Sequence, residues 1–198
     1  MIRIKKSEIS RKGLHLFSSI IPMSYFFIFR DRQLMFIILF SLSIIALTIE
    51  YFRNIKKGIF NKIFIDFLSP VLRQAELNGN FTGATWMMLS FALTVLLFDL
   101  QIAVSALLFL SIGDAVAALV GKQYPIGKIW NKSVFASFIS VITCIFVVSS
   151  IHLQLQPIII IVGAISAMII ELVPLKINDN FSIPLFSGFT MQLCVEIL

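Results

Sequence analysis

The chain has 198 residues, of which 59% are apolar and only 13% are charged, and its formal net charge is +6. A soluble domain of this length needs more polar surface, so the composition argues against a soluble protein and places the chain in a lipid bilayer. The basic residues stand in short clusters between long apolar runs. This argues against a nucleic-acid partner and is typical of contacts with an anionic leaflet or with phosphate.

The apolar runs predict an all-α, polytopic integral membrane protein with about seven transmembrane helices. A spanning helix needs roughly 17 to 25 mostly apolar residues, and a bilayer leaves few alternatives to helices. The predicted spans are residues 14–30, 33–51, 82–99, 101–120, 133–152, 157–172 and 184–198. No repeat or linker divides the chain, so we expect one domain covering residues 1–198.

Lysine and arginine counts predict the orientation of these spans. The basic residues gather in the amino-terminal segment and in the connections 52–81, 121–132 and 173–183, whereas the opposite connections carry almost none. The positive-inside rule therefore places the amino terminus and these connections in the cytoplasm. We expect a microbial plasma membrane, with any active site on its cytoplasmic face.

Residues 52–81 form the only sizeable polar stretch, and within them lies the segment FNKIFIDFLSPVLRQ at 60–74. Helical spacing places five apolar side chains on one face: Phe60, Ile63, Phe64, Phe67 and Leu68. The pattern predicts an interfacial amphipathic helix. Either a simple surface anchor or a lid that admits lipid fits this pattern.

Three carboxylates fall inside or at the ends of predicted spans, namely Glu50, Asp114 and Glu171. An ionisable group in a membrane is costly and indicates function. All three belong to the cytoplasmic half of their spans. Polar residues at the starts of other spans reach the same level: Arg11, Lys12, His15, Thr82, Lys132, Ser133, Asp179 and Asn180.

Asp114 lies in SIGDAVAALVG, where small residues let a backbone or a ligand approach closely. The loop that follows it carries Lys122, Lys128 and Lys132. An acid before a Gly- and Lys-containing loop suits phosphate chemistry, because Mg²⁺ takes carboxylate and phosphate oxygens while lysines neutralise the remaining charge. Tight helix packing around the acid and an ordinary positive-inside loop are the alternatives. No Walker A motif occurs.

Five segments together resemble the family of CTP-dependent lipid kinases, which includes dolichol kinase, phytol kinase and a CTP-using diacylglycerol kinase. The segments are EISRKGLHL at 8–16, EYFR at 50–53, FTGATWMML at 81–89, GDAVAALVGKQYPIGKIWNKS at 113–133 and ELVPLKINDNFSIPL at 171–185. They occur in the family's order and cover most of the chain.

The resemblance implies a CTP-binding region that includes Asp114, Ala117, Gly121, Lys128, Lys132, Ser133, Asp179 and Asn180. The chain departs from the family pattern at three places in particular: Phe135 replaces an acid, Ala136 a glycine, and Asn178 the first acid of an acidic pair. Mg²⁺ and CTP are the expected cofactor and phosphate donor, and the acceptor is a membrane lipid alcohol of the polyprenol, phytol or diacylglycerol type.

The expected reaction moves the γ-phosphate of CTP to the lipid hydroxyl. Asp114, with Asp179 or Glu171, would hold Mg²⁺, and positioning and electrostatics supply most of the catalysis. Four cations would spread the charge of the transferring group: Arg11, Lys12, Lys128 and Lys132. A carboxylate or His15 would take the hydroxyl proton. Four further residues are expected on the substrate side: Glu50, Arg53, Thr82 and Gly83.

Two other functions fit the same residues. A cytidylyltransferase of CDP-lipid synthesis would also join CTP to a lipid, but by attack on the α-phosphate. A small membrane transporter would line an ion path with Glu50, Asp114 and Glu171. The oligomeric state is left open by the sequence.

Overall fold

The computed structural model describes residues 6–55, 71–130 and 132–198. Over these residues the protein is all-α apart from one short hairpin, which confirms the all-α part of the predicted fold class. The helices join end to end into seven rods. In chain order the elements are α1 (Lys6–Ser18), α2 (Ile20–Ser24), the π-helical η1 (Tyr25–Phe29), α3 (Arg32–Ile55), α5 (Gln74–Leu77), α6 (Gly83–Leu97), α7 (Leu100–Leu108), the π-helical η2 (Phe109–Asp114), α8 (Ala115–Gln123), β1 (Lys128–Ile129), β2 (Lys132–Ser133), α9 (Val134–Ser150), α10 (Pro157–Leu172) and α11 (Asp179–Ile197).

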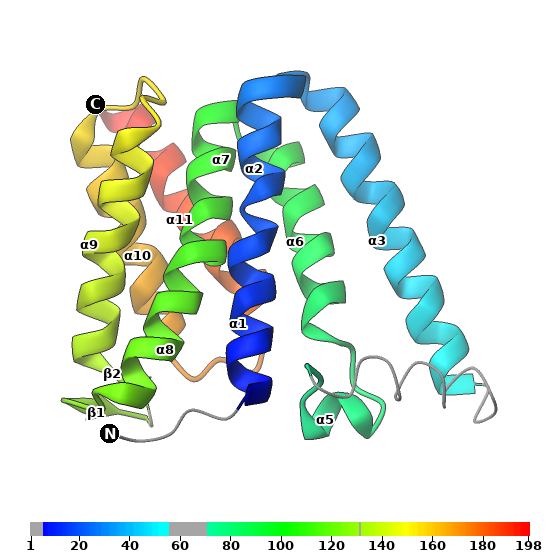
Figure 1. Ribbon diagram of the computed structural model, residues 1–198. Coiled ribbons are helices and arrows are strands. Elements are labelled where there is room, and N and C mark those ends of the chain that lie inside the picture. The colour runs from blue at the N-terminus through cyan, green and yellow to red at the C-terminus, as the bar shows by residue number, and fades with distance from the viewer. Residues whose placement is uncertain (1–5, 56–70, 131) are drawn as a thin grey trace.

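The rods run alternately up and down between two ends of the molecule (Figure 1). One end, which we call the polar end, holds the start of α1, the short helix α5, the β1–β2 hairpin and the connection from α10 to α11. The other end holds shorter connections and the carboxyl terminus. The described parts of the four basic connections therefore lie at one end, as the charge pattern predicts.

Within the described ranges, two helical segments are long and apolar enough to cross a bilayer. They are Arg32–Asn54, with 23 residues, and Leu100–Gln123, with 24, and each has a mean hydropathy of 2.2. The first is 22% buried and the second 78% buried, so the first lies at the edge of the bundle and the second at its centre. Three other apolar helices are shorter: Gly83–Leu97, Val134–Ser150 and Pro157–Leu172.

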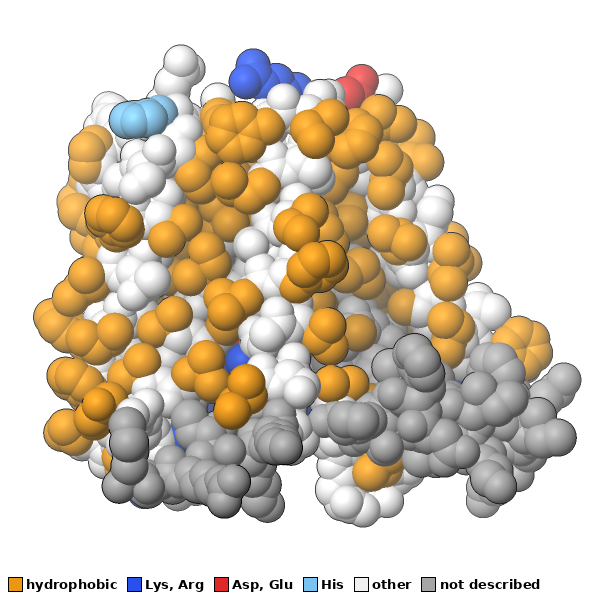
Figure 2. Space-filling view, in the orientation of Figure 1, with side chains coloured by type: hydrophobic (Ala, Val, Ile, Leu, Met, Phe, Trp, Pro, Cys, Tyr) orange, Lys and Arg blue, Asp and Glu red, His pale blue; other side chains and the backbone are white. Residues whose placement is uncertain are grey.

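The bundle is apolar outside and partly polar inside. Figure 2 shows hydrophobic side chains from end to end on the visible face, with few charges between them. Large apolar residues such as Phe17, Ile28 and Phe146 are exposed on the described surface. Hydroxyls are fully buried at Ser90, Thr94, Ser105, Ser111, Ser140 and Ser187. An apolar exterior of this extent is typical of a surface that contacts lipid or another protein.

Two helices begin earlier than the sequence predicts. The first starts at Lys6 rather than near residue 14, so Lys12 and His15 are helical. The last starts at Asp179, because the Asn178 side chain caps it by accepting from the Asn180 N–H at 3.0 Å. It continues through Pro184, whose missing N–H frees the Asn180 carbonyl. Ser90 Oγ on α6 donates to that carbonyl at 2.7 Å, so the helix is not interrupted.

The β1–β2 hairpin is absent from the sequence-based prediction. It pairs Lys128 with Ser133 and Ile129 with Lys132. Gly127 and Trp130 take positive φ angles of 64° and 45° around it. The hairpin reverses the chain between α8 and α9, so that Lys132 and Ser133 lie directly before the start of α9.

Most of the predicted amphipathic helix lies outside the described residues. That holds for all five residues of its apolar face: Phe60, Ile63, Phe64, Phe67 and Leu68. At its described end, residues 71–73 are not helical, and Arg73 instead precedes α5. The predicted helix therefore does not reach residue 74.

Candidate functional site

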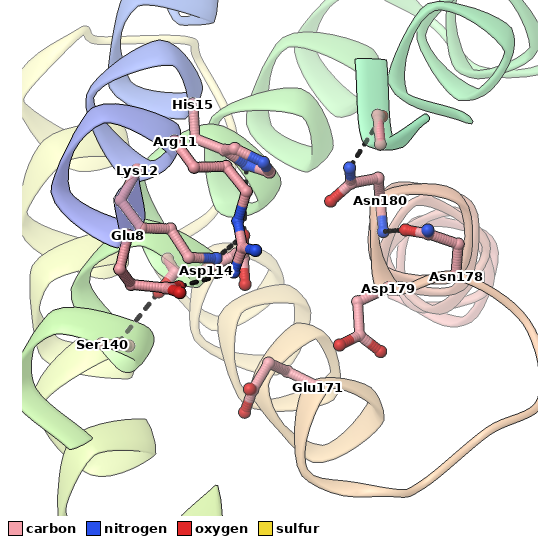
Figure 3. A network of polar contacts seen from close by, with 12 residues as sticks. Glu8, Arg11, Lys12, His15, Asp114, Ser140, Glu171, Asn178, Asp179 and Asn180 are labelled. Carbon is pink, nitrogen blue, oxygen red and sulfur yellow. Dashed lines mark hydrogen bonds and ion pairs between the residues drawn. The ribbon is translucent and has the colours of Figure 1, made fainter. Parts of the chain in front are cut away.

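Asp114 lies at the centre of a buried cluster of charged groups at the polar end (Figure 3). Lys12 Nζ donates to Asp114 Oδ2 at 2.5 Å, and His15 Nδ1 lies 3.1 Å from the same oxygen. Lys12 and His15 share one face of α1 because residues three apart are neighbours on a helix. Asp114 ends the π-helical turn η2, a distortion that often accompanies functional sites. Two basic groups of α1 thus meet one acid of the central rod.

A second set of ion pairs joins α1 to α8 around Glu8. Arg11 Nη2 lies 2.5 Å from Glu8 Oε1, and Lys122 Nζ lies 2.7 Å from Glu8 Oε2. Burial raises the pKa of Glu8, but the Lys122 hydrogen bond and the Arg11 charge outweigh it and hold the pKa below its ordinary value. Glu8 therefore stays ionised and positions Arg11 beside the Asp114 cluster.

Lys132 connects the starts of α9 and α11 with the end of α10. Its Nζ lies 3.3 Å from Glu171 Oε1 and 3.0 Å from Asp179 Oδ2, and it also donates to the Glu171 carbonyl. Burial lowers the pKa of Lys132, but the two nearby carboxylates raise it by more. The net result is a pKa above the ordinary value. Ser137 Oγ donates to Glu171 Oε2 at 3.4 Å. Two carboxylates thus converge on one ammonium group.

These groups line a cavity of about 210 Å³, which we call the polar cavity. Nine predicted site residues lie in its wall: Arg11, Lys12, Asp114, Ala117, Gly121, Lys132, Ser133, Glu171 and Asp179. Arg73, Ala118, Lys122 and Ser137 complete the lining. Ser133 also caps α9 by accepting from the Ala136 N–H at 3.3 Å, so a helix amino terminus borders the cavity. Five cations, three carboxylates and this helix end favour a highly charged anion together with a cation.

A second cavity, of about 260 Å³, lies between α1, α3 and α6, and we call it the apolar cavity. It contains six predicted site residues: Arg11, His15, Glu50, Thr82, Gly83 and Asn180. Apolar side chains, including Leu14, Ile49 and Met87, form much of the remaining wall. Arg11 and Arg73 line both cavities, so the two adjoin.

Glu50 and Arg53 form a hydrogen-bonded network with the loop before α6. Glu50 Oε1 accepts from the Thr82 N–H at 2.7 Å and from Thr85 Oγ1 at 3.0 Å, and Glu50 Oε2 lies 2.6 Å from Arg53 Nη2. Arg53 also donates to the carbonyls of Glu76, at 3.0 Å, and Asn80, at 2.7 Å. This network fixes α6 against α3 and shapes the wall of the apolar cavity.

Glu76 and Asn180 complete that wall around Gly83. Glu76 accepts from the backbone N–H groups of Arg73 and Gly83, each at 2.7 Å, and Asn180 Nδ2 donates to the Gly83 carbonyl at 2.8 Å. Neither Glu76 nor Arg73 is identified as a site residue by the sequence alone. No motif identifies either one, because their roles depend on the path of the chain before α6.

Lys128 is the one predicted site residue with no place near these groups. It is exposed on β1 and lines neither cavity. The hairpin accounts for this placement. Lys128 pairs with Ser133 in the hairpin, and side chains of neighbouring strand residues point to opposite faces. Lys122, from the end of α8, lines the polar cavity instead.

Within the described ranges, no group of three or more His, Cys, Asp or Glu side chains is arranged to hold a metal ion. Mg²⁺ in phosphate-transferring sites, however, takes only one or two carboxylates together with phosphate oxygens. Glu171 and Asp179, which converge on Lys132, provide such a pair. These two carboxylates are therefore the residues present that could hold a magnesium ion.

No known family model matches the chain, and no solved structure matches it. A relative from Rickettsia prowazekii (strain Madrid E), uncharacterized protein RP860, is 34% identical over 186 residues. The match covers 90% of this chain and 90% of that protein. Identity at this level along nearly the whole of both sequences indicates a shared fold.

Proposed function

The chain belongs to one family with the Rickettsia prowazekii protein, and we propose that it is a multi-pass membrane kinase that transfers the γ-phosphate of CTP to a lipid alcohol. The observation that carries this proposal is the polar cavity. Five cations and three carboxylates meet there from α1, η2, α8, α10, α11 and the segments around α5 and β2. An apolar cavity adjoins it, so a charged nucleotide and an apolar acceptor can meet at one wall.

The residues of the polar cavity divide the work of phosphoryl transfer. Glu171 and Asp179 would hold Mg²⁺, which neutralises phosphate charge when it is bound. Arg11, Lys12 and Lys132 would balance the charge that spreads over the transferring group. Sequence reasoning assigns the metal to Asp114 as well. Because Asp114 already contacts Lys12 and His15, we give it the task of positioning them.

The distribution of buried charge favours an enzyme over a transporter. Seven Lys, Arg, His, Asp or Glu side chains are buried among the described residues: Lys12, His15, Glu50, Arg53, Glu76, Asp114 and Glu171. All belong to the half of the bundle nearest the polar end, whereas the buried polar groups toward the other end are uncharged. An ion path would require charged or coordinating groups at both levels.

The proposal also covers the membrane topology. We propose that all seven rods cross a plasma membrane, with the polar end in the cytoplasm. The exposed apolar side chains on the flanks and the basic connections at the polar end support this orientation. Labelling of single cysteines with a membrane-impermeant reagent tests it. Modification near residue 10 only after the cells are permeabilised is expected, and modification there in intact cells would contradict the orientation.

The decisive test is transfer of label from γ-labelled CTP, with ATP in parallel, to polyprenol, phytol-type alcohol and diacylglycerol. We expect labelled lipid and CDP with CTP, and at least about a hundredfold loss in Asp114→Asn, equivalent to about 2.7 kcal/mol. Asp99→Asn is the matched control, because Asp99 is 74% exposed at the opposite end. Release of pyrophosphate would indicate cytidylyl transfer instead. Absence of label in folded wild-type protein would remove the kinase assignment.

A further inference from the structure

The lining of the apolar cavity combines apolar side chains with several charged ones. Leu14 of α1, Ala46 and Ile49 of α3, and Met87 of α6 contribute apolar surface, and Leu72 contributes more from the chain before α5. Among the described elements, α3 packs mainly on α6 and makes a small contact with η1, so α1 and α3 diverge toward the polar end (Figure 1). The cavity occupies this space. Its shape and lining suit an aliphatic chain that enters between helices.

Most polar groups in this wall are already engaged. Glu50, Thr82 and Thr85 bond to one another, and the Asn180 amide donates to Gly83. Arg11 and His15 differ. Across the described part of the chain, Arg11 Nε is buried and has no hydrogen-bond acceptor, and His15 Nδ1 has only the Asp114 contact. A buried donor without an acceptor is costly, so Arg11 Nε has capacity for a polar ligand atom. Because His15 Nδ1 faces Asp114, the other ring nitrogen of His15, Nε2, is the atom that can meet a ligand.

We propose that the apolar cavity binds the hydrocarbon chain of an alcohol and presents its hydroxyl to Arg11 and His15, at the wall shared with the polar cavity. The identity of this ligand as the acceptor rests on the proposed kinase function, whereas binding of an apolar alcohol does not. Polyprenol, phytol-type alcohol and diacylglycerol share this chemistry, namely a hydroxyl on an aliphatic chain. The lining of the cavity comes from α1, α3 and α6, together with residues 71–76 and Asn180.

The position of His15 gives the acceptor hydroxyl a defined proton acceptor. In the transfer step, the hydroxyl oxygen bonds to the γ-phosphorus and the bond from that phosphorus to the β–γ bridging oxygen breaks. The nucleoside diphosphate leaves, and the hydroxyl proton passes to the imidazole of His15. Asp114 Oδ2, 3.1 Å from His15 Nδ1, orients the ring and stabilises the charge that it gains. Arg11, which lines both cavities, borders both substrates.

Photolabelling tests the cavity without requiring turnover. Purified protein in nanodiscs is irradiated with a diazirine-bearing isoprenoid alcohol, and the labelled residues are located by mass spectrometry. We expect label on α1, α3 and α6 around Leu14, Ile49 and Met87, and competition by unlabelled phytol-type alcohol or by diacylglycerol identifies the preferred class. Label confined to other helices would overturn the proposal.

Two tryptophan variants on one helix form a matched pair. Ala46→Trp fills the cavity and is expected to reduce photolabel at least tenfold while leaving binding of a fluorescent CTP analogue unchanged. Ile45→Trp adds similar bulk on the outer face, where Ile45 is 54% exposed, and is expected to leave both readouts unchanged. If Ala46→Trp does not fold, Ala84→Leu narrows the same cavity from α6. Unchanged photolabel in a folded cavity variant would contradict the proposal.

The failure of the kinase function and the failure of the cavity assignment give different results. Labelled α1, α3 and α6 without phosphate transfer would leave the cavity assignment in place and remove the kinase. Phosphate transfer with label elsewhere would do the opposite. His15→Gln is expected to retain photolabel and to lose transfer about a hundredfold, whereas loss of both would show that His15 acts only in the structure of the wall.

Discussion

Two buried acids at the polar end, Glu50 and Asp114, have different surroundings. Glu50 contacts Arg53, the Thr82 backbone and the Thr85 hydroxyl, and every one of these partners belongs to α3 or the start of α6. Among the described residues, the Asp114 carboxylate contacts only Lys12 and His15, and it lines a cavity with other charged groups. A buried acid indicates function when its partners leave room for a ligand, and indicates structure when local donors satisfy it.

Replacing Glu50 should have the largest effect on stability. Glu50→Gln removes one charge of a buried ion pair, a change that costs about 3 to 5 kcal/mol. We expect a large fall in the thermal unfolding midpoint in detergent. Glu171→Gln is the comparison, because Lys132 keeps Asp179 and the Glu171 carbonyl as partners. Equal destabilisation by the two variants would show that both acids are structural.

Asp179→Asn should lower phosphate transfer about a hundredfold, about 2.7 kcal/mol, because the proposed metal loses one of two carboxylates. Its effect on stability should stay below about 1 kcal/mol, since the ion pair with Lys132 is partly exposed. Transfer of label and the unfolding midpoint measure the two effects separately. Asn178→Asp is the control, because aspartate also caps a helix and should preserve both properties. An active Asp179→Asn protein would rule out the metal assignment.

Gly83→Ala should destabilise the wall of the apolar cavity by about 1 to 3 kcal/mol. A Cβ at Gly83 would lie 2.9 Å from Asn180 Nδ2, which must then leave the Gly83 carbonyl. Gly13→Ala is the matched control. A Cβ there meets nothing within 4 Å, so the helix should gain about 0.5 to 1 kcal/mol. Chemical denaturation of the two variants compares them, and a neutral Gly83→Ala would show that Asn180 can move freely.

The smallest expected effect concerns the link between α1 and α8. Because the pKa of Glu8 lies below its ordinary value of 4.5, its contribution to stability is present above pH 4.5 and is lost as the pH falls through the lowered pKa. Glu8→Gln should cost about 1 kcal/mol near neutral pH, and the difference from wild type should shrink below pH 4.5. Unfolding midpoints measured across this range test the expectation. A difference that grows on acidification would reverse the sign of the effect.

Much of the architecture can be predicted from the sequence. Each predicted apolar run overlaps a helical rod of the described residues, and residues 157–172 match α10 at both ends. The starts of α1 and α11 could not be predicted from hydropathy. The first turns of α1, from Lys6 to Leu14, are mostly polar although they continue directly into an apolar helix. In the second case, a proline such as Pro184 normally ends a helix, yet α11 continues through it. The tertiary bond from Ser90 to the Asn180 carbonyl decides the second case.

Many residues of the site could also be predicted. Few charged residues occur in the apolar helices, and most of them lie near the same end of the bundle. Nine of the predicted residues line the polar cavity. Arg73 and Glu76 could not be identified, since they lie in a connection whose path no local pattern specifies. The same limit explains Lys128, which the β1–β2 hairpin removes from the cavities.

The sequence by itself determines that this protein forms apolar helices with basic connections gathered at one end, because helix length and charge placement are local properties. Only the tertiary structure decides which base faces which acid. Lys12 and Asp114 are 102 residues apart, and their contact depends on the rotation of α1 against the central rod. Glu50 and Asp114 look alike in the sequence, and their different partners arise from helix packing, which distributes donors and empty space across the whole chain.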